Sequence, residues 1–271
     1  MLGLRLSRTI ATPPNDESFF ASFSLTLPVA IRFLLHTKGT GGLKLLFLIL
    51  AESALETMPA SLQNEPAVRS LAKRRKKAPS RLILDSSLFP SLVRKLPMGE
   101  KRGRPDIIHI SLLCALRTPL SMEGHLKVYV HTLDDKIIDI DPTVRLPRNY
   151  NRFIGLIEQL YEHSQVPPNS KPLLALKNMS LPALLREINP EKTILFCEEG
   201  VRVDLNDYMR NLSSLSRVVA MVGGFPHGSF SSQTESLADD KISIYDRPLE
   251  AWTVVSRVIY SYELAIFRKT E

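Results

Sequence analysis

Residues 217–228 read RVVAMVGGFPHG, and this stretch predicts the fold. Residues 217–222 form a short, mostly apolar run, which is typical of a strand buried within an α/β sheet. Gly223 and Gly228 follow it, at what should be the carboxyl edge of that sheet, where open α/β sheets bind ligands. Glycines at such an edge let a ligand approach the backbone closely. An ordinary tight turn explains the same residues, so further observations are needed.

Apolar runs and periodic segments alternate through the rest of the chain. Further strands are predicted at 45–50, 81–84, 193–197 and 242–245, and a hairpin at 127–132 and 136–140. Helices are predicted at 51–58, 106–116, 149–162 and 249–267. Strands interleaved with helices indicate an α/β fold, with a mostly parallel sheet flanked by helices. Residues 1–42 lack a clear period and are interpreted as an N-terminal extension of unclear role, before a domain that spans 43–271.

Composition narrows the class of protein. The chain has 271 residues, 44% hydrophobic and 23% charged, which fits a globular protein and excludes extensive disorder. Two cysteines exclude a disulfide framework and a four-cysteine zinc site, and no metal-binding spacing of histidines occurs. The longest apolar run, 45–51, is too short to cross a bilayer, so no membrane partner is expected. We expect a cytoplasmic location, with Cys114 and Cys197 as core thiols.

Positive charge is concentrated in one segment. The net charge is +7, yet residues 69–104 hold twelve Lys or Arg and two acidic residues, a local charge of +10. The most basic part is a polar segment at about 59–80, which we interpret as a loop. Such a field attracts polyanions, of which nucleic acid is the common one. A solvated charge run without a partner is the alternative.

Two further clusters carry candidate functional residues. Arg145, Arg148 and Arg152 are spaced three and four apart, so they would share a face near the start of a helix. Like charges on one helix face and positive charge near the start of a helix each slightly destabilise the helix, which suggests that an anion such as an RNA phosphate is bound there. A solvated basic face is the alternative. Asp106 suits the start of the helix at 106–116, and it could also hold Arg104 in one rotamer for a ligand.

Segments of the chain occur together, in this order, in one family. They are LAESALE (50–56), LD (84–85), RGRPDIIH (102–109), HTLDD (131–135), RLPRNY with RF (145–153), GGFPHG (223–228), and ISIY (242–245) before AWT (251–253). Over about residues 43–266 the chain resembles the ribosomal small-subunit pseudouridine N1-methyltransferases, the "essential for mitotic growth" ribosome-biogenesis family, and the archaeal branch most closely.

The resemblance implies a fold, a cofactor and site residues. The fold would be of the SPOUT methyltransferase type, with a trefoil knot within about 193–267, in a homodimer. The residues implied to bind S-adenosylmethionine are Gly223, Gly228, Ile244, Tyr245, Asp246, Arg247, Pro248 and Leu249. Those implied to bind ribosomal RNA are Arg104, Arg145, Arg148 and Arg152. Asp106 would act in the catalytic site by stabilising Arg104, since a carboxylate paired with arginine is a poor base.

The implied activity is N1-methylation of a pseudouridine in small-subunit rRNA, with a role in ribosome biogenesis. Its partners would be that rRNA, a second copy of the chain and ribosomal assembly proteins, with no DNA partner. Two alternatives stay open. One is a non-catalytic rRNA-binding factor for small-subunit assembly, and the other is a related SPOUT enzyme that acts on another RNA, such as tRNA.

Overall fold

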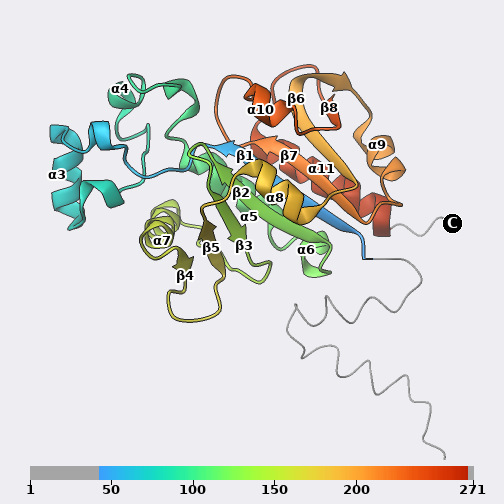
Figure 1. Ribbon diagram of the computed structural model, residues 1–271, viewed down its shortest axis with the longest axis horizontal. Coiled ribbons are helices and arrows are strands. Elements are labelled where there is room, and N and C mark those ends of the chain that lie inside the picture. The colour runs from blue at the N-terminus through green and yellow to red at the C-terminus, as the bar shows by residue number, and fades with distance from the viewer. Residues whose placement is uncertain (1–42, 268–271) are drawn as a thin grey trace, which may run out of the picture. The chain divides into compact units, whose positions relative to one another are not determined.

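The computed structural model describes residues 43–267, so the predicted N-terminal extension lies outside the described range. Its centre is an eight-stranded sheet of order β4-β5-β3-β2-β1-β7-β6-β8 (Figure 1). The strands are β1 (Leu45–Ser53), β2 (Leu126–Thr132), β3 (Ile137–Ile140), β4 (Gln165–Val166), β5 (Leu174–Lys177), β6 (Lys192–Arg202), β7 (Arg217–Gly223) and β8 (Asp240–Ser243). Strands β2, β1, β7, β6 and β8 run parallel, and β3, β5 and β4 extend the sheet in antiparallel fashion. The predicted mostly parallel α/β sheet is confirmed.

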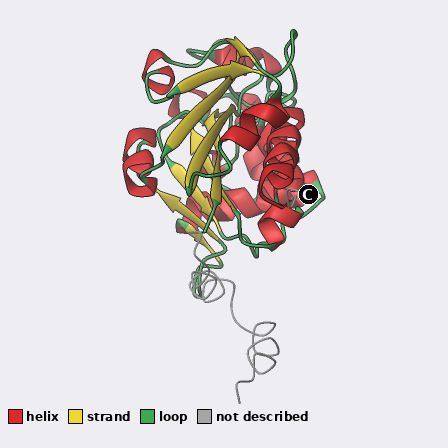
Figure 2. Cartoon of the chain, turned by 90° about the vertical axis from the view of Figure 1, so that its right-hand side faces the viewer, coloured by secondary structure: helices red, strands yellow, loops and turns green. Residues whose placement is uncertain are grey.

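Helices cover both faces of this sheet (Figure 2). Helices α5 (Pro105–Ala115), α7 (Tyr150–His163), α9 (Leu205–Asn211) and α11 (Ala251–Phe267) pack on one face, and α8 (Leu181–Ile188) packs on the other. Shorter elements are η2 (Ala60–Leu62), α3 (Pro66–Arg75), η3 (Pro79–Arg81), α4 (Pro90–Val93), η4 (Gly99–Lys101), α6 (Pro119–Met122) and α10 (Ser232–Glu235). None of the helices between residues 43 and 267 has the length and apolar character needed to cross a membrane.

Strand β1 supplies the centre of the core. Its even-numbered residues Leu46, Leu48 and Leu50 face the α5–α11 side, and the odd-numbered residues between them face α8. A strand buried on both faces is a continuous apolar run, as residues 45–50 predict. Because β1 pairs in parallel with both β2 and β7, the carboxyl ends of the three strands lie at one edge, where Ala51 is paired with Gly223.

The predicted loop at 59–80 is wrong, because residues 66–75 form the helix α3. Pro66 begins the helix, and three basic residues in its last turn suit the negative end of the helix dipole. Val68, Leu71 and Ala72 are buried in a separate small core, which is formed by residues of the chain segment that connects β1 to α5. Arg75 and Lys77 form ion pairs with the buried carboxylate of Glu158, which fasten α3 to α7.

The segment after residue 50 differs from the prediction of a helix at 51–58. Strand β1 continues to Ser53, and Thr57 forms an isolated bridge with Ile83, which is all that remains of the predicted strand at 81–84. Tertiary partners decide this conformation, because the carboxyl end of β1 pairs with β2 and β7.

Two smaller predictions also need correction, although helix α5 forms as predicted and packs through Ile107, Ile108 and Leu112. Helix α11 begins at Ala251 rather than at residue 249. The two cysteines are half-buried rather than core thiols.

Candidate functional site

A cavity of about 700 Å³ opens at the carboxyl ends of β6, β7 and β8. Two loops form most of its wall, namely residues 223–230 after β7 and residues 244–250 before α11. The ends of β6, β7 and β8, the first residues of α11, and Arg104 with Ile107 also line it. Its size and its mixture of apolar side chains with backbone groups suit a small-molecule ligand.

The predicted cofactor residues gather at this cavity. Gly223, Gly228, Ile244, Tyr245, Arg247, Pro248 and Leu249 all line it. Asp246 does not, because it faces a smaller adjoining pocket and pairs with Arg202 at 3.3 Å. The structure thus brings together two loops that the sequence separates by about 15 residues.

The first loop is held against the end of β1 by glycine. A Cβ atom on Gly224 would lie 2.2 Å from the hydroxyl of Ser53, so no larger residue fits there. The Gly224 amide donates to Ala51 O, and Gly224 O accepts from the Ala54 amide, each at 2.8 Å. Gly228 has a φ of +92°, a conformation that side chains rarely adopt. The loop therefore turns tightly and presents its backbone to the cavity.

Arg104 and Asp106 form the predicted contact beside the cavity. Arg104 Nε donates to Asp106 Oδ1 and Nη2 donates to Oδ2, both at 2.9 Å. The hydrogen bond to Asp106 and the nearby charges of Glu250 and Asp85 raise the pKa of Arg104. Both side chains are about one-third exposed, so the guanidinium is held in one orientation while remaining open to a ligand. Its role in RNA binding stays a prediction.

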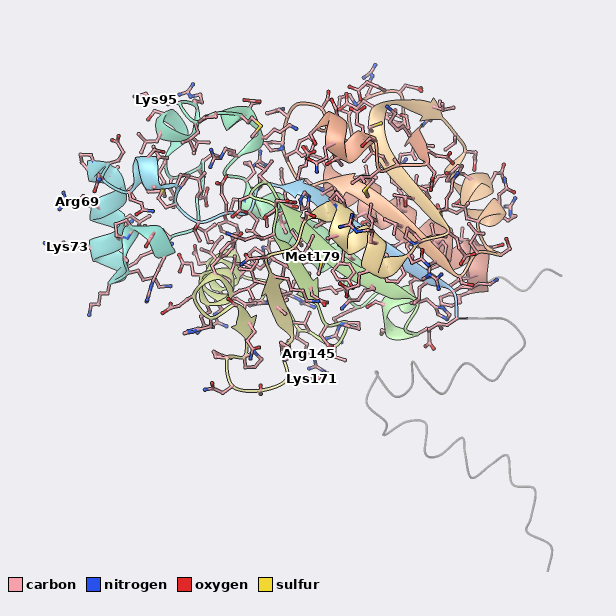
Figure 3. All side chains as sticks on the ribbon, viewed as in Figure 1. Arg69, Lys73, Lys95, Arg145, Lys171 and Met179 are labelled. Atoms are coloured by element: carbon pink, nitrogen blue, oxygen red, sulfur yellow. The ribbon has the colours of Figure 1, made fainter. Side chains whose placement is uncertain are left out.

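The other three arginines do not share a helix face, because α7 begins only at Tyr150. Asn149 caps the helix by accepting a hydrogen bond from the Arg152 amide at 3.1 Å, so Arg145 and Arg148 lie in the preceding loop. All three are exposed, and none lines the cavity. In Figure 3, Arg145 lies far from the α3 end of the molecule.

This arginine loop rests on α5. The carbonyl of Pro147 lies 2.7 Å from His109 Nε2, and the His109 ring stacks on Phe153 with centroids 4.3 Å apart. Tyr150 donates a hydrogen bond to Asp85 at 2.6 Å. Because His109 is one turn after Asp106 on α5, the same helix supports the arginine loop and the Arg104–Asp106 pair.

The sequence prediction missed the end of β6. This strand continues past Cys197, and Glu198 and Glu199 line the cavity. Polar residues directly after a parallel strand were the available signal. Burial and the charge of Glu199 raise the pKa of the Cys197 thiol, which disfavours a nucleophilic role. Among residues 43–267 no cluster of three or more His, Cys, Asp or Glu could hold a metal ion.

Comparisons with known proteins agree on one family. The model of the EMG1/NEP1 methyltransferase family matches residues 48–263. The ribosomal RNA small subunit methyltransferase Nep1 of Pyrococcus furiosus is 47% identical over 225 residues, 83% of this chain and 99% of that protein. The Nep1 of Thermoplasma acidophilum is 37% identical over 224 residues, 82% of this chain and 99% of that protein. The crystal structure of Archaeoglobus fulgidus Nep1 bound to S-adenosylhomocysteine superposes with a TM-score of 0.71 at 35% identity, covering 83% of this chain and 98% of that one.

Proposed function

The chain belongs to the EMG1/NEP1 methyltransferase family, and from this premise we propose that it transfers a methyl group from S-adenosylmethionine to N1 of a pseudouridine in small-subunit ribosomal RNA. The family resemblance and the α/β methyltransferase fold predicted from the sequence are confirmed. The observation that carries the proposal is the cavity between the 223–230 and 244–250 loops, which opens beside Arg104.

The cavity fits an adenosyl cofactor by its chemistry. Phe196, Val222 and Leu249 give apolar surface for an adenine ring, and the tight turn at Gly228 leaves backbone groups that can hydrogen-bond to its edge. Glu198 and Glu199 supply negative charge, which favours the positive sulfonium and ammonium groups of this cofactor. When bound, the cofactor supplies the methyl electrophile.

The surface around the cavity suits RNA. The guanidinium of Arg104 lies in the wall with its orientation fixed by Asp106, which lowers the entropy lost when it grips a phosphate. Further exposed cations lie on α3, where Figure 3 shows Arg69 and Lys73 pointing outward. A base must leave its stack to reach a cavity of this kind, so an unpaired loop nucleotide is the favoured target.

The chain's own residues supply alignment rather than covalent chemistry. Pseudouridine is linked to its ribose through carbon, so N1 carries a proton that must leave as the N–C bond forms. Both carboxylate oxygens of Asp106 are engaged by Arg104, so Asp106 positions the arginine and the proton passes to water. Holding N1 in line with the methyl group and excluding other water is then the main catalytic contribution.

The proposal also covers the oligomeric state, the chain topology and the cellular location of the protein. We expect a homodimer, since the exposed side chains of Tyr260 and Phe267 leave apolar surface on α11. The trefoil knot that the resemblance implies within about 193–267 is part of the same proposal, and β6 and β8 pair as neighbours in that range. A cytoplasmic role in ribosome biogenesis, with assembly proteins as further partners, follows from the same proposal.

Methyl transfer to synthetic hairpins tests the function. The protein and radiolabelled S-adenosylmethionine are incubated with a hairpin that carries one loop pseudouridine, and with the same hairpin carrying uridine. We expect label only in the pseudouridine hairpin, and none after Gly228→Trp, which distorts the cavity wall because Gly228 has a φ of +92° and a Cβ there would lie 3.2 Å from Lys101. Tight RNA binding without any transfer would instead indicate a non-catalytic assembly factor, and preferred labelling of a tRNA would indicate a different substrate.

A further inference from the structure

A buried ion pair packs against the loop of residues 223–231 that follows β7, here called the cofactor loop. Glu52, the penultimate residue of β1, is 6% exposed, and Lys101 at the end of η4 is 8% exposed. Lys101 Nζ donates to Glu52 Oε2 at 2.9 Å. Glu52 has a φ of +50°, a left-handed conformation that is strained for a residue with a side chain. Two buried charges and a strained backbone at one place call for an explanation beyond packing.

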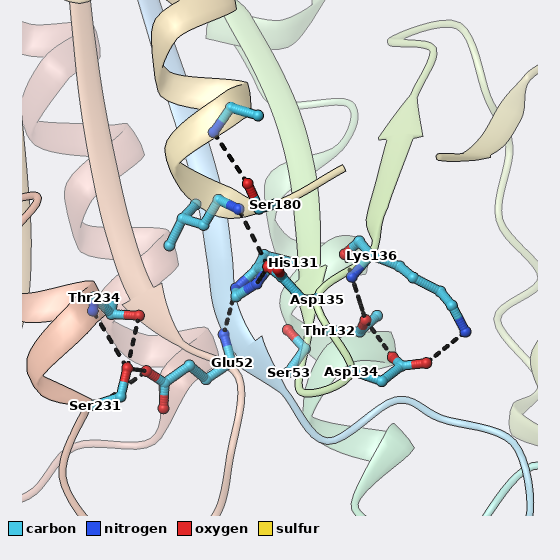
Figure 4. A network of polar contacts seen from close by, with 12 residues as sticks. Glu52, Ser53, His131, Thr132, Asp134, Asp135, Lys136, Ser180, Ser231 and Thr234 are labelled. Atoms are coloured by element: carbon cyan, nitrogen blue, oxygen red, sulfur yellow. Dashed lines mark hydrogen bonds and ion pairs between the residues drawn. The ribbon is translucent and has the colours of Figure 1, made fainter. Parts of the chain in front are cut away.

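The second carboxylate oxygen of Glu52 binds the far end of the cofactor loop (Figure 4). Glu52 Oε1 accepts hydrogen bonds from the Ser231 amide at 2.9 Å and from its hydroxyl at 2.7 Å. Ser231 also caps α10, so these bonds fix the point at which the loop ends. Burial alone would raise the pKa of Glu52, but the hydrogen bonds from Lys101 and Ser231 outweigh it and lower the pKa.

Lys101 contacts the middle of the same loop. Its Nζ lies 4.5 Å from the centroid of the Phe225 ring, a cation–π contact. Its Cε lies 3.2 Å from the position that a Cβ on Gly228 would occupy. Phe225 and Gly228 both line the cavity. The ion pair therefore contacts the loop at three separated positions, and neither of its residues lines the cavity.

A neighbouring ion pair shows that these contacts are specific. Arg102 Nε donates to Glu56 Oε1 at 2.8 Å, which joins the same two chain segments as Glu52 and Lys101. The hydrogen bonds of Arg102 go to Glu56 and Pro97 and reach no residue of the 223–231 loop. The two segments are thus tied together without Glu52, and a buried ion pair adds little net stability. The Glu52–Lys101 pair differs from the Arg102–Glu56 pair in that it contacts the 223–231 loop.

We propose that Glu52 and Lys101 are positioning residues that hold the 223–231 loop in the shape that binds the adenosyl cofactor. This inference rests on the proposed function, because it assigns the loop a cofactor to bind. A loop fixed in advance loses less conformational entropy when the ligand binds, so the pair raises affinity without touching the ligand. Glu52 reaches this loop across 179 positions of sequence.

Binding of S-adenosylhomocysteine to matched variants tests the inference. Trp252 is the only tryptophan and follows Ala251 of the cavity wall, so its fluorescence, with calorimetry, gives the dissociation constant. Glu52→Gln and Lys101→Met should raise the dissociation constant about tenfold or more, the factor that a hydrogen bond to a charged group carries. Glu56→Gln, the matched control, should change it by less than about twofold, because the Arg102–Glu56 pair makes no hydrogen bond to the loop.

Kinetics separate positioning from general damage. Glu52→Gln should raise KM for the cofactor, while kcat at saturating cofactor stays within about threefold of the unchanged protein. Ser231→Ala removes one of the Glu52 hydrogen bonds and leaves the buried pair intact, so it should raise the dissociation constant about threefold even if Glu52→Gln does not fold.

Two results would overturn the inference. The first is that Ser231→Ala, or a folded Glu52→Gln, binds S-adenosylhomocysteine as tightly as the unchanged protein. The second is that Glu56→Gln weakens binding as much as Glu52→Gln does. Failure of the unchanged protein to bind S-adenosylhomocysteine at all would overturn the proposed function together with the inference. The two failures are therefore distinguishable.

Discussion

Replacement of Asp106 by alanine isolates the orienting role of this carboxylate. In the native protein two hydrogen bonds of 2.9 Å hold the Arg104 guanidinium. Each side chain of the pair is 36% exposed, so solvent screening limits its contribution to folding to about 0.2–1 kcal/mol. Loss of a negative charge from the first turn of α5 adds about 0.3–1 kcal/mol. The Asp106→Ala protein should therefore fold, with a slightly lower Tm.

The same substitution should weaken RNA binding clearly, although it destabilises the folded protein only slightly. A free arginine side chain carries about 2 kcal/mol of rotamer entropy, and Asp106 removes much of it before RNA binds. If Arg104 regains about 1.4 kcal/mol of this rotamer entropy in the variant and must lose it on binding RNA, the affinity falls about tenfold. Fluorescence anisotropy with a labelled hairpin at fixed salt measures this change. Affinity for S-adenosylhomocysteine should stay the same, because Asp106 does not line the cavity.

A double-mutant cycle provides the control. In an Arg104→Ala background, Asp106→Ala should cause no further loss of RNA affinity, since the group that it orients is gone. Asp246→Ala removes a more exposed carboxylate that pairs with Arg202 beside the cavity, and it should leave RNA binding unchanged. Normal RNA affinity in the Asp106→Ala protein, or a full additional loss in the Arg104→Ala background, would refute the orienting role. A kcat that collapses at saturating RNA would indicate a proton-accepting role instead.

Three further predictions concern charge, packing and pH. If Arg145, Arg148 and Arg152 contact phosphates, each change to alanine should reduce the slope of log affinity against log salt by about 0.7–0.9, and an unchanged slope for all three would remove them from the RNA surface. Gly224→Ala should lower the unfolding free energy by about 1–3 kcal/mol in urea titration, because its Cβ meets a neighbouring hydroxyl at 2.2 Å, and a neutral result would contradict this close packing. The pKa of Glu52 is lowered on folding from its ordinary value of 4.5, so its contribution to stability is complete above that pH and is lost as pH falls through the folded pKa. Acid should therefore destabilise the unchanged protein more steeply than Glu52→Gln, and parallel pH curves would contradict the shift.

Local patterns were sufficient for much of the sheet and one wall of the site. Continuous apolar runs predicted the core of β1, β6 and β7, because a strand buried on both faces needs apolar residues at every position. The glycines at 223 and 228 marked the loop after β7, because a tight turn and a left-handed φ restrict those positions within a few residues. The resemblance to a family then added the 244–249 loop, and it favoured the contact between Arg104 and Asp106 that the residues had suggested as one of two interpretations.

Helix α3 was not predicted, because only three of its residues are apolar and buried while most of the others are charged or polar. The cap at Asn149 removed Arg145 and Arg148 from the helix that their spacing suggested. Such effects depend on a single side chain or a small core, so a period in the sequence does not reveal them.

Tertiary structure alone decided the end of β1 and what supports the cofactor loop. The sequence around Glu52 suits a helix, yet the strand continues, because its neighbours β2 and β7 supply hydrogen bonds that the segment cannot make by itself. The partners of Glu52 are Lys101, 49 positions away, and Ser231, 179 positions away. Local sequence determines which residues can form a strand or a turn, whereas buried charges are satisfied by partners that only the folded chain brings within hydrogen-bond distance.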